Sequence, residues 1–290
     1  LNYSNPTQII AEAVHQFSNV PCISICDQSK DDLKTILQAL RLEPAEAMLE
    51  SVGLNHATWS TKFTIDNQDG VTLMNEACDD VLARADVSNR TKRQFVLTRE
   101  YGAVPNSYMQ YYYFKEDCVN EAKIAKKTRA ETIMDALPGY YKYFQKQAKE
   151  ESPKLEQGRG GALFGDMAVE VLKALRLQDR SIHTLNVPNL GALSDFAADR
   201  IVEVPARIDG KGATPLVQPA FNPEVKGLLS MLAEYQMLAA KAIWNENSSA
   251  LPKALAANPL VISVSLAKRL LEDIKPLQNQ WLPEALTQNL

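Results

Sequence analysis

An apolar segment that ends in a thiol and a carboxylate constrains the fold more than any other part of this 290-residue chain. Pro21–Cys26 (PCISIC) is short and apolar, as a buried strand is, and Asp27 follows it directly. The preceding segment, Thr7–Phe17, carries apolar residues at helical spacing. A helix followed by a buried strand forms an α/β unit, and open α/β sheets bind ligands at the carboxyl ends of their strands. We therefore expect Cys26 and Asp27 at the ligand-binding edge of a sheet.

The rest of the chain predicts many helices and a few strands. Together with the α/β unit at the start of the chain, they predict the α/β fold class. Helices are expected at Asp31–Leu40, Pro44–Leu49, Val71–Ala85, Arg90–Tyr101, Asp166–Leu175, Pro223–Asn245, Pro252–Ala257 and Val264–Ile274, and over most of Lys115–Ala148 with a break at Pro138-Gly139. Strands are expected at Ser51–Ile65, Ser181–Val187 and Arg200–Arg207.

Composition and charge exclude several classes of protein. Hydrophobic residues make up 46% and charged residues 23% of the chain, as in globular domains. The net charge of -4 predicts no general attraction to nucleic acid or to an anionic membrane. No apolar run approaches the roughly 20 residues that span a bilayer. Because the four cysteines have no paired spacing and Leu1–Ile10 has no signal-peptide pattern, we expect a cytoplasmic protein.

Cys26 and His56 are candidate metal ligands, although each has a more ordinary interpretation. A single buried cysteine usually packs as a small apolar side chain, and a single histidine is more often a hydrogen-bonded structural residue. Their separation of 30 positions is not a zinc-finger pattern. Two protein ligands would leave positions open for substrate oxygens. Asp27 is a candidate acid, with a helix cap or turn as its more ordinary role.

Three further features each carry a chemical and a structural interpretation. The aromatic cluster Tyr108–Tyr113 either fills a core or supplies a base, and a tyrosine acts as a base only if a nearby cation lowers its pKa. The glycine-rich segment 157–165 fits neither the dinucleotide fingerprint nor the P-loop, so we interpret it mainly as a flexible loop and helix start. Arg93, Arg129 and Arg159 are candidate anion ligands, with a solvated surface position as the alternative.

Taken together, short motifs along the whole chain resemble the NAD-dependent glycoside hydrolases of family 4, most closely the 6-phospho-β-glucosidases. The motifs are Asn2-Tyr3-Ser4-Asn5-Pro6, Ile25-Cys26-Asp27, Gly53-Leu54-Asn55-His56 with Trp59, Gly102–Tyr108 with Tyr111–Phe114, Thr128-Arg129-Ala130-Glu131, Asn186 with Asn189 and Gly191-Ala192-Leu193, Val202-Glu203-Val204-Pro205, and Asn258–Val261 with Ser263-Val264. Each motif is short, and their order and spacing carry the resemblance.

The resemblance implies a redox-assisted elimination with NAD and Mn²⁺ as cofactors, an exception to the two-carboxylate scheme of most glycosidases. NAD⁺ takes a hydride from C3 of the sugar, and a tyrosine removes the acidified C2 proton. By position, Cys26 and His56 resemble the metal ligands. Tyr111 resembles the base, with Tyr108 as the second choice, and Asp27 resembles the acid that assists the leaving group.

The resemblance also implies which residues bind substrate. The expected partner is a phosphorylated disaccharide, with Asn5 and Asn55 at the sugar and Arg129 at its 6-phosphate, where a forked guanidinium suits phosphate oxygens. A homodimer or homotetramer is expected, because family members commonly form one.

The chain departs from the family pattern in ways that keep alternatives open. Residues 1–35 correspond to the C-terminal end of a Rossmann-type sheet, without the preceding glycine-rich turn, and residues 36–290 to a mixed, mostly helical α+β catalytic domain. Gln28-Ser29 follows Cys26-Asp27 where relatives often have a small or apolar residue and Pro. The alternatives are therefore a 6-phospho-α-glucosidase or an α-galactosidase of the same family, or a non-catalytic remnant without an NAD site.

Overall fold

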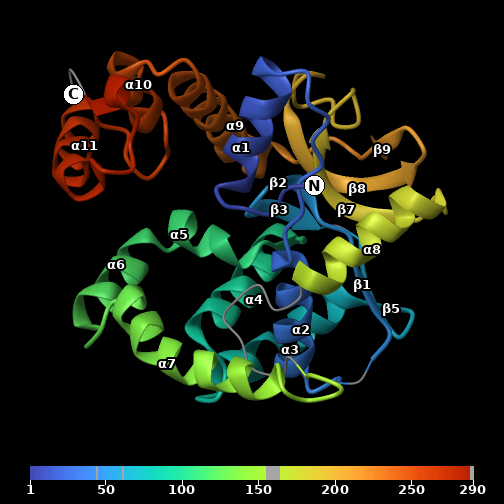
Figure 1. Ribbon diagram of the computed structural model, residues 1–290. Coiled ribbons are helices and arrows are strands. Elements are labelled where there is room, and N and C mark those ends of the chain that lie inside the picture. Colours follow the sequence, from blue (N-terminus) through green and yellow to red (C-terminus); the bar gives the residue numbers. More distant parts are fainter. Residues whose placement is uncertain (44, 61, 155–163, 288–290) are drawn as a thin grey trace.

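The computed structural model describes residues 1–43, 45–60, 62–154 and 164–287, and its mixed α/β architecture confirms the predicted fold class (Figure 1). The helices are α1 (Thr7–Phe17), α2 (Gln28–Leu40), α3 (Gly70–Ala83), α4 (Asn89–Tyr101), η1 (Ser107–Met109), α5 (Gln110–Tyr113), α6 (Lys115–Ile124), α7 (Arg129–Gln147), α8 (Phe164–Leu177), α9 (Pro223–Trp244), η2 (Ser248–Ala250), α10 (Leu251–Ala256), α11 (Val264–Gln278) and α12 (Glu284–Thr287). The strands are β1 (Ala47–Leu49), β2 (Val52–Leu54), β3 (Ala57–Ser60), β4 (Phe63–Ile65), β5 (Gln68–Asp69), β6 (Val104–Pro105), β7 (Ile182–Pro188), β8 (Ile201–Asp209) and β9 (Gly212–Pro215).

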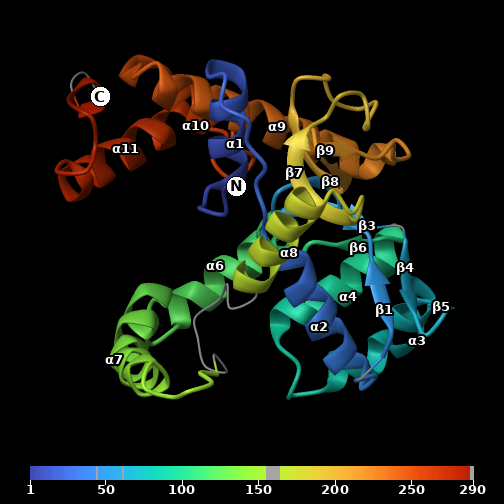
Figure 2. The same cartoon turned by 45° about the vertical axis from the view of Figure 1, so that its right-hand side comes forward.

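The main sheet has the strand order β6-β3-β2-β8-β7, with β9 paired to β8. Its longest ladder is antiparallel, between β7 and β8, and runs from Ile182 opposite Arg207 to Pro188 opposite Ile201. A smaller antiparallel sheet has the order β1-β4-β5. In the views of Figures 1 and 2, α1, α9, α10 and α11 lie on one side of the main sheet, and α2, α3 and α4 lie on the other.

The hydrophobic core has three parts, each formed where a helix covers a strand. Ile25 lies in the first, with β7, β8 and the buried face of α8. The second packs α2, α3 and α4 around Phe63. The third joins the β2–β3 hairpin to α4 and α9 through Leu54, Trp59 and Leu229. The hairpin is therefore held between helices that are distant in sequence.

The predicted strand at Pro21–Cys26 is wrong in extent. Only Ser24 pairs there, in a parallel bridge to Asn2 and an antiparallel bridge to Asn186 of β7. The chain therefore extends the sheet at a single residue before it enters α2. Cys26 still follows this contact and precedes the helix, as the α/β interpretation requires.

Other element predictions were also wrong. Within the predicted helix Pro44–Leu49, residues Ala47–Leu49 instead form β1, because they pair with β4 and this tertiary contact outweighs the local preference for a helix. Ser51–Ile65 is not one strand but β2, β3 and β4, since the chain turns at Asn55-His56. Pro138 does not break α7, which contains it. Most residues of α7 are exposed, so water can bond the carbonyl that Pro138 leaves without a donor.

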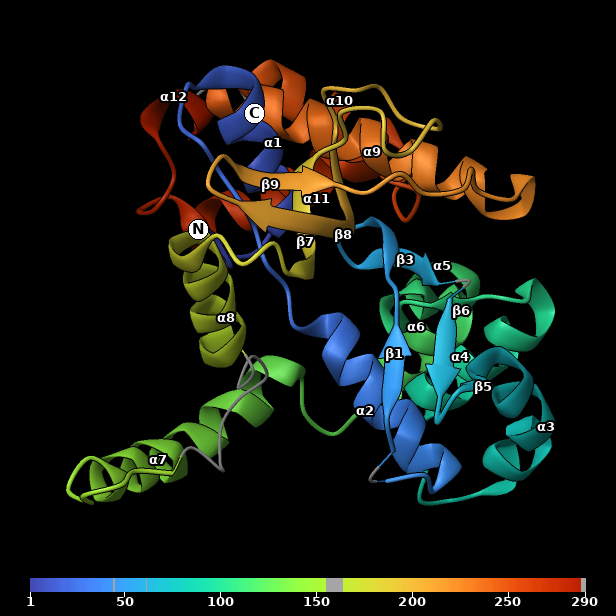
Figure 3. The ribbon, with the colours of Figure 1, turned by 90° about the vertical axis from the view of Figure 1, so that its right-hand side faces the viewer.

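Two neighbouring helices contribute little to the hydrophobic core. Helices α6 and α7 bury no residue completely, and Figure 3 shows α7 at the end of the molecule opposite α10 and α11. Most of the glycine-rich segment 157–165 lies outside the described residues, and α8 begins at Phe164.

None of the helices in the described part of the chain is both long enough and apolar enough to cross a membrane.

Candidate functional site

Cys26 and His56 lie next to each other in the folded chain. Cys26 is 5% exposed and precedes α2, whereas His56 belongs to the turn between β2 and β3. The Cys26 Sγ and His56 Nε2 atoms are 3.4 Å apart. The fold therefore brings together the two residues that the sequence predicted as metal ligands.

The β2–β3 turn places His56 by means of an unusual backbone. Leu54 pairs with Ala57, so only Asn55 and His56 form the turn, and His56 has a φ of 63°. Gly53 has a φ of 148°, and a Cβ added there would lie 2.5 Å from the Ala57 carbonyl oxygen. Such a conformation and such a contact require glycine. Gly53 thus permits the turn that carries His56.

Burial sets the protonation of the pair. It lowers the pKa of His56 to about 4, helped by the Arg90 cation, so the imidazole is neutral at pH 7. Burial also raises the pKa of Cys26 to about 12, with the Glu203 carboxylate as the next contribution. The thiol is therefore protonated unless a cation binds beside it. A neutral imidazole is a suitable metal ligand, and so is a thiol whose proton is displaced when a cation binds.

A buried carboxylate that the sequence analysis gave no role supports the turn. Glu203 of β8 is 2% exposed and accepts hydrogen bonds from Asn55 Nδ2 (2.7 Å) and Asn186 Nδ2 (2.9 Å). Burial raises the pKa of Glu203 to about 7. A glutamate inside the apolar strand sequence IVEVPAR was the signal that could have identified it.

A cavity of about 580 Å³ opens beside His56, within the size range of small-molecule sites. Its lining residues come from the N-terminal segment, the β2–β3 turn, the η1–α5 region and α9: Asn5, Pro6, Thr7, Gln8, Ile9, Asn55, His56, Tyr108, Tyr112, Leu232, Tyr235 and Gln236. Gln236 Oε1 is buried without a partner in the described part of the chain, which leaves an acceptor in this wall. Asn5, Asn55 and His56 therefore share one cavity.

The Cys26–His56 pair fits a divalent cation. With the distances typical of zinc, about 2.3 Å to sulfur and about 2.1 Å to nitrogen, two ligands lie about 3.1 Å apart at a right angle and about 3.6 Å apart at the tetrahedral angle. The observed 3.4 Å falls between these values. Among the described residues no group of three or more His, Cys, Asp or Glu is arranged to hold a metal. The remaining ligands of a bound ion would come from other groups, such as water or substrate oxygens.

The other predicted residues lie at different distances from this cavity. Asp27 adjoins Cys26 in sequence and precedes α2. Tyr111 is 43% exposed and is not a lining residue, whereas Tyr108 lines the cavity and stacks on His56, with ring centroids 4.4 Å apart. Arg129 is exposed at the start of α7 and is not among the lining residues. Cys26 is not a lining residue but contacts His56, which lines the cavity with Asn5 and Asn55. Tyr111 is likewise one contact away, because its ring centroid lies 5.9 Å from that of Tyr108. No described contact joins Arg129 to the cavity.

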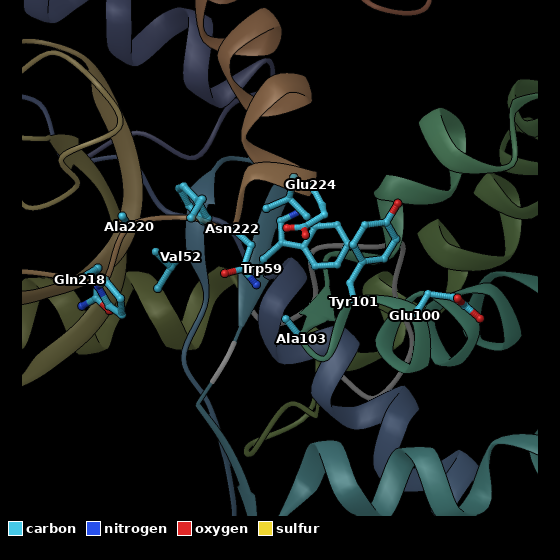
Figure 4. A pocket seen from close by; sticks show the side chains of 12 residues that line it. Val52, Trp59, Glu100, Tyr101, Ala103, Gln218, Ala220, Asn222 and Glu224 are labelled. Atoms are coloured by element: carbon cyan, nitrogen blue, oxygen red, sulfur yellow. The ribbon is translucent and has the colours of Figure 1, made fainter.

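A second cavity, of about 210 Å³, contains none of the predicted site residues (Figure 4). It lies between the β2–β3 hairpin, the end of α4 and the segment before α9, with Trp59 and Tyr101 in its wall.

Comparison with known proteins shows the family of the chain. Residues 51–261 match the model of the family 4 glycosyl hydrolase C-terminal domain. The chain is 29% identical over 304 residues to a maltose-6'-phosphate glucosidase of Fusobacterium mortiferum, with 98% of this chain and 67% of the relative covered. It is 24% identical over 292 residues to the 6-phospho-β-glucosidase of Escherichia coli K12, with 98% and 65% covered.

Among solved structures, the chain is similar to the 6-phospho-β-glucosidase of Thermotoga maritima with manganese, NAD⁺ and glucose-6-phosphate. The TM-score is 0.79 at 20% identity, and the match covers 97% of this chain and 66% of the solved chain. Relatives named as maltose-6'-phosphate or phospho-α-glucosidases are 26–29% identical to this chain, and those named as 6-phospho-β-glucosidases are 22–24% identical. The chain spans about two thirds of the length of these relatives. Because the family model matches well over half of its residues, the chain belongs to glycosyl hydrolase family 4.

Proposed function

We propose that this chain forms the metal- and sugar-binding part of a glycosidase that cleaves 6-phosphoglycosides. The observation that carries the proposal is the contact between Cys26 and His56, 3.4 Å apart, because His56 lines a cavity together with Asn5 and Asn55. Family membership supports this assignment. In this proposal Cys26 and His56 hold Mn²⁺ or another divalent ion, and Asn5 and Asn55 bind sugar hydroxyls.

The bound metal ion would acidify a C–H bond next to a sugar carbonyl. A tyrosine takes that proton: we propose Tyr111 as predicted from the sequence, with Tyr108 as the alternative because it lines the cavity. Asp27 assists the leaving group. Arg129 as the phosphate ligand stays a prediction, since no described contact brings it to the cavity.

NAD is proposed as the second cofactor from the family assignment. The 290 residues contain no G-x-G-x-x-G motif, so they do not supply the turn that holds a dinucleotide in a Rossmann fold. The hydride step is therefore assigned to no residue of this chain. The proposed division at residues 35 and 36 between a nucleotide-binding unit and a catalytic domain likewise stays a prediction, as do the cytoplasmic location and the homodimer or homotetramer.

The proposed substrate is a 6-phospho-β-glucoside, as the resemblance implied. A specific observation favours the α-anomer as a second candidate, because the relatives named for α-linked substrates are the more identical ones, at 26–29% against 22–24%. The two anomers differ at the scissile bond, whereas both carry the 6-phosphate.

The test compares four nitrophenyl glucosides, α and β, each with and without a 6-phosphate, with Mn²⁺ and NAD⁺ present and on the protein purified from its source. The proposal predicts turnover of a phosphorylated compound only, and loss of turnover in Cys26→Ser. Turnover of the plain compounds would indicate another substrate class. If none of the four is hydrolysed and NAD⁺ does not bind, the protein is a non-catalytic remnant.

A further inference from the structure

His56 is held from the side by an aromatic ring to which the sequence analysis gave only a second-choice role. The Tyr108 ring lies 4.4 Å from the His56 ring at an interplanar angle of 23°, which is stacking geometry. His56 has a φ of 63° and belongs to a two-residue turn, so its ring position depends on this turn and on what packs against the ring. Tyr108 therefore restricts the orientation of the imidazole that faces Cys26.

Tyr108 is in turn anchored by a cation. The Arg90 guanidinium carbon lies 4.4 Å from the centre of the Tyr108 ring, within cation–π distance. Arg90 Nε also donates to Ser107 Oγ at 2.7 Å, next to Tyr108 in the chain. One arginine of α4 thus fixes both the ring and the residue before it.

A buried carboxylate ties this arrangement to the segment that carries Cys26. Asp32 of α2 is 3% exposed, and it accepts hydrogen bonds from the Ser107 backbone N–H (3.0 Å) and the Ser107 hydroxyl (2.5 Å). Gln28, two positions after Cys26, donates to the same carboxylate at 2.8 Å. A buried carboxylate with three donors and a nearby cation is costly to rearrange. Asp32 and Ser107 therefore join the segment that carries Cys26 to the residue before Tyr108, whose ring stacks on His56.

We propose that Tyr108 and the Asp32–Ser107–Arg90 cluster are positioning residues that hold His56 at Cys26 in the geometry that a divalent cation needs. This proposal rests on the metal site of the proposed function. Residues that orient metal ligands without touching the metal commonly change metal affinity about 10- to 100-fold when they are mutated. None of these four residues needs to touch the ion to have this effect.

The test measures Co²⁺ binding to the full chain by the thiolate-to-metal absorption band. A band that is present in the wild type and absent from Cys26→Ser is assigned to Cys26. Tyr108→Leu and Asp32→Asn should each bind Co²⁺ about 10- to 100-fold more weakly. Tyr108→Phe keeps the ring and should bind Co²⁺ as the wild type does, even if activity falls. Binding of Co²⁺ by Tyr108→Leu with wild-type affinity would overturn the proposal.

Asp195→Asn is the matched control. Asp195 is also a shielded carboxylate, which accepts from the Phe221 backbone N–H (2.8 Å) and pairs with Lys226 (2.8 Å), but it belongs to neither metal-ligand segment. It should leave Co²⁺ affinity unchanged, and an equal loss in Asp195→Asn would show that the Asp32→Asn effect is general destabilisation and so contradict positioning.

If the wild type shows no Cys26-dependent band, the metal site of the proposed function fails, and crystal structures then decide the positioning claim. In that case Tyr108→Leu should show a Cys26–His56 separation clearly longer than the wild type's. An unchanged separation would overturn the claim.

Discussion

At the residue scale, the turn that carries His56 depends on a glycine. Gly53→Ala places a Cβ 2.5 Å from the Ala57 carbonyl oxygen at a φ of 148°, so we expect it to lower the free energy of unfolding by about 1–3 kcal/mol. The control is Gly227→Ala on an exposed position of α9, where a Cβ meets nothing within 4 Å. That variant should gain about 0.5–1 kcal/mol from helix propensity. Urea unfolding of both variants checks the prediction, which fails if Gly53→Ala is as stable as the wild type.

Glu12 makes stability depend on pH. It is 1% exposed, one oxygen accepts from the Ile201 backbone N–H at 2.8 Å, and the other has no partner in the described part of the chain. Burial raises the pKa of Glu12 from 4.5 to about 7. Because the folded state binds this proton more tightly than the unfolded state does, the stabilisation is complete below about pH 4.5 and is lost as the pH rises through about 7.

We therefore expect the free energy of unfolding to fall between pH 5 and pH 8. Glu203 and Asp32, whose pKa values burial also raises, contribute in the same direction. Glu12→Gln should reduce the slope by about 1 kcal/mol per pH unit, since one titrating group contributes at most about 1.4. Urea unfolding at four pH values gives the slope, and an equal slope in wild type and Glu12→Gln would exclude Glu12 as its source.

The sequence was informative about which unusual side chains meet in the fold, while their role as metal ligands stays a prediction. A Cys-Asp pair after an apolar segment and a histidine after Gly53 identified residues that the fold places together. The sequence did not identify Glu203, Asp32 or Arg90, because their significance comes from burial and from partners more than 15 positions away. Of these three, only Glu203 lies in an apolar strand sequence that could have indicated its burial.

At the scale of elements, two helix caps of the same kind should have different consequences. Ser88 caps α4 by accepting from the Thr91 backbone N–H (3.2 Å), and Thr128 caps α7 by accepting from that of Glu131 (3.2 Å). Helix α4 packs in the core, whereas α7 buries no residue completely. Ser88→Ala should therefore lower the global free energy of unfolding by about 1 kcal/mol.

Thr128→Ala should instead act locally. We expect faster hydrogen exchange at the amides of the first turn of α7, with the global unfolding midpoint unchanged, because a helix without buried residues opens without the core. Exchange measured by mass spectrometry separates the two variants. A loss of global stability in Thr128→Ala equal to that in Ser88→Ala would contradict this account of α7.

Element boundaries were predictable where a residue marks the end of a helix: Asp69 and Ser88 cap α3 and α4, and Pro223 begins α9. They were not predictable in the short strands. β1 has three residues and exists only because it pairs with β4, and Ser24 joins the sheet through single bridges. Contacts of this kind lie far apart in sequence and leave no local period.

At the scale of the whole molecule, binding of a divalent ion should stabilise the fold. An ion at about 100 times its Kd adds about 2.7 kcal/mol if it binds only the folded state. We therefore expect Mn²⁺ to raise the melting temperature of the wild type and not that of His56→Ala. Melting curves with and without excess Mn²⁺ test this, and an equal rise in both proteins would place the stabilising ion elsewhere.

The α/β class and the family were predictable from motifs whose order extends along the whole chain, and the match to residues 51–261 confirms that family. The cavity was not predictable, because its lining comes from the N-terminal segment, the β2–β3 turn, the η1–α5 region and α9. Only the packing of α1 and α9 beside the hairpin brings these segments to one place (Figure 1).

The central claim is that Cys26 and His56 together hold a divalent ion at this cavity. The most direct measurement is a titration with Mn²⁺ at pH 7.5, followed by the electron paramagnetic resonance signal of the free ion, for the wild type, Cys26→Ser and His56→Ala. The account predicts one bound Mn²⁺ per chain in the wild type and loss of that binding in both variants. Wild-type binding retained in either variant would contradict it.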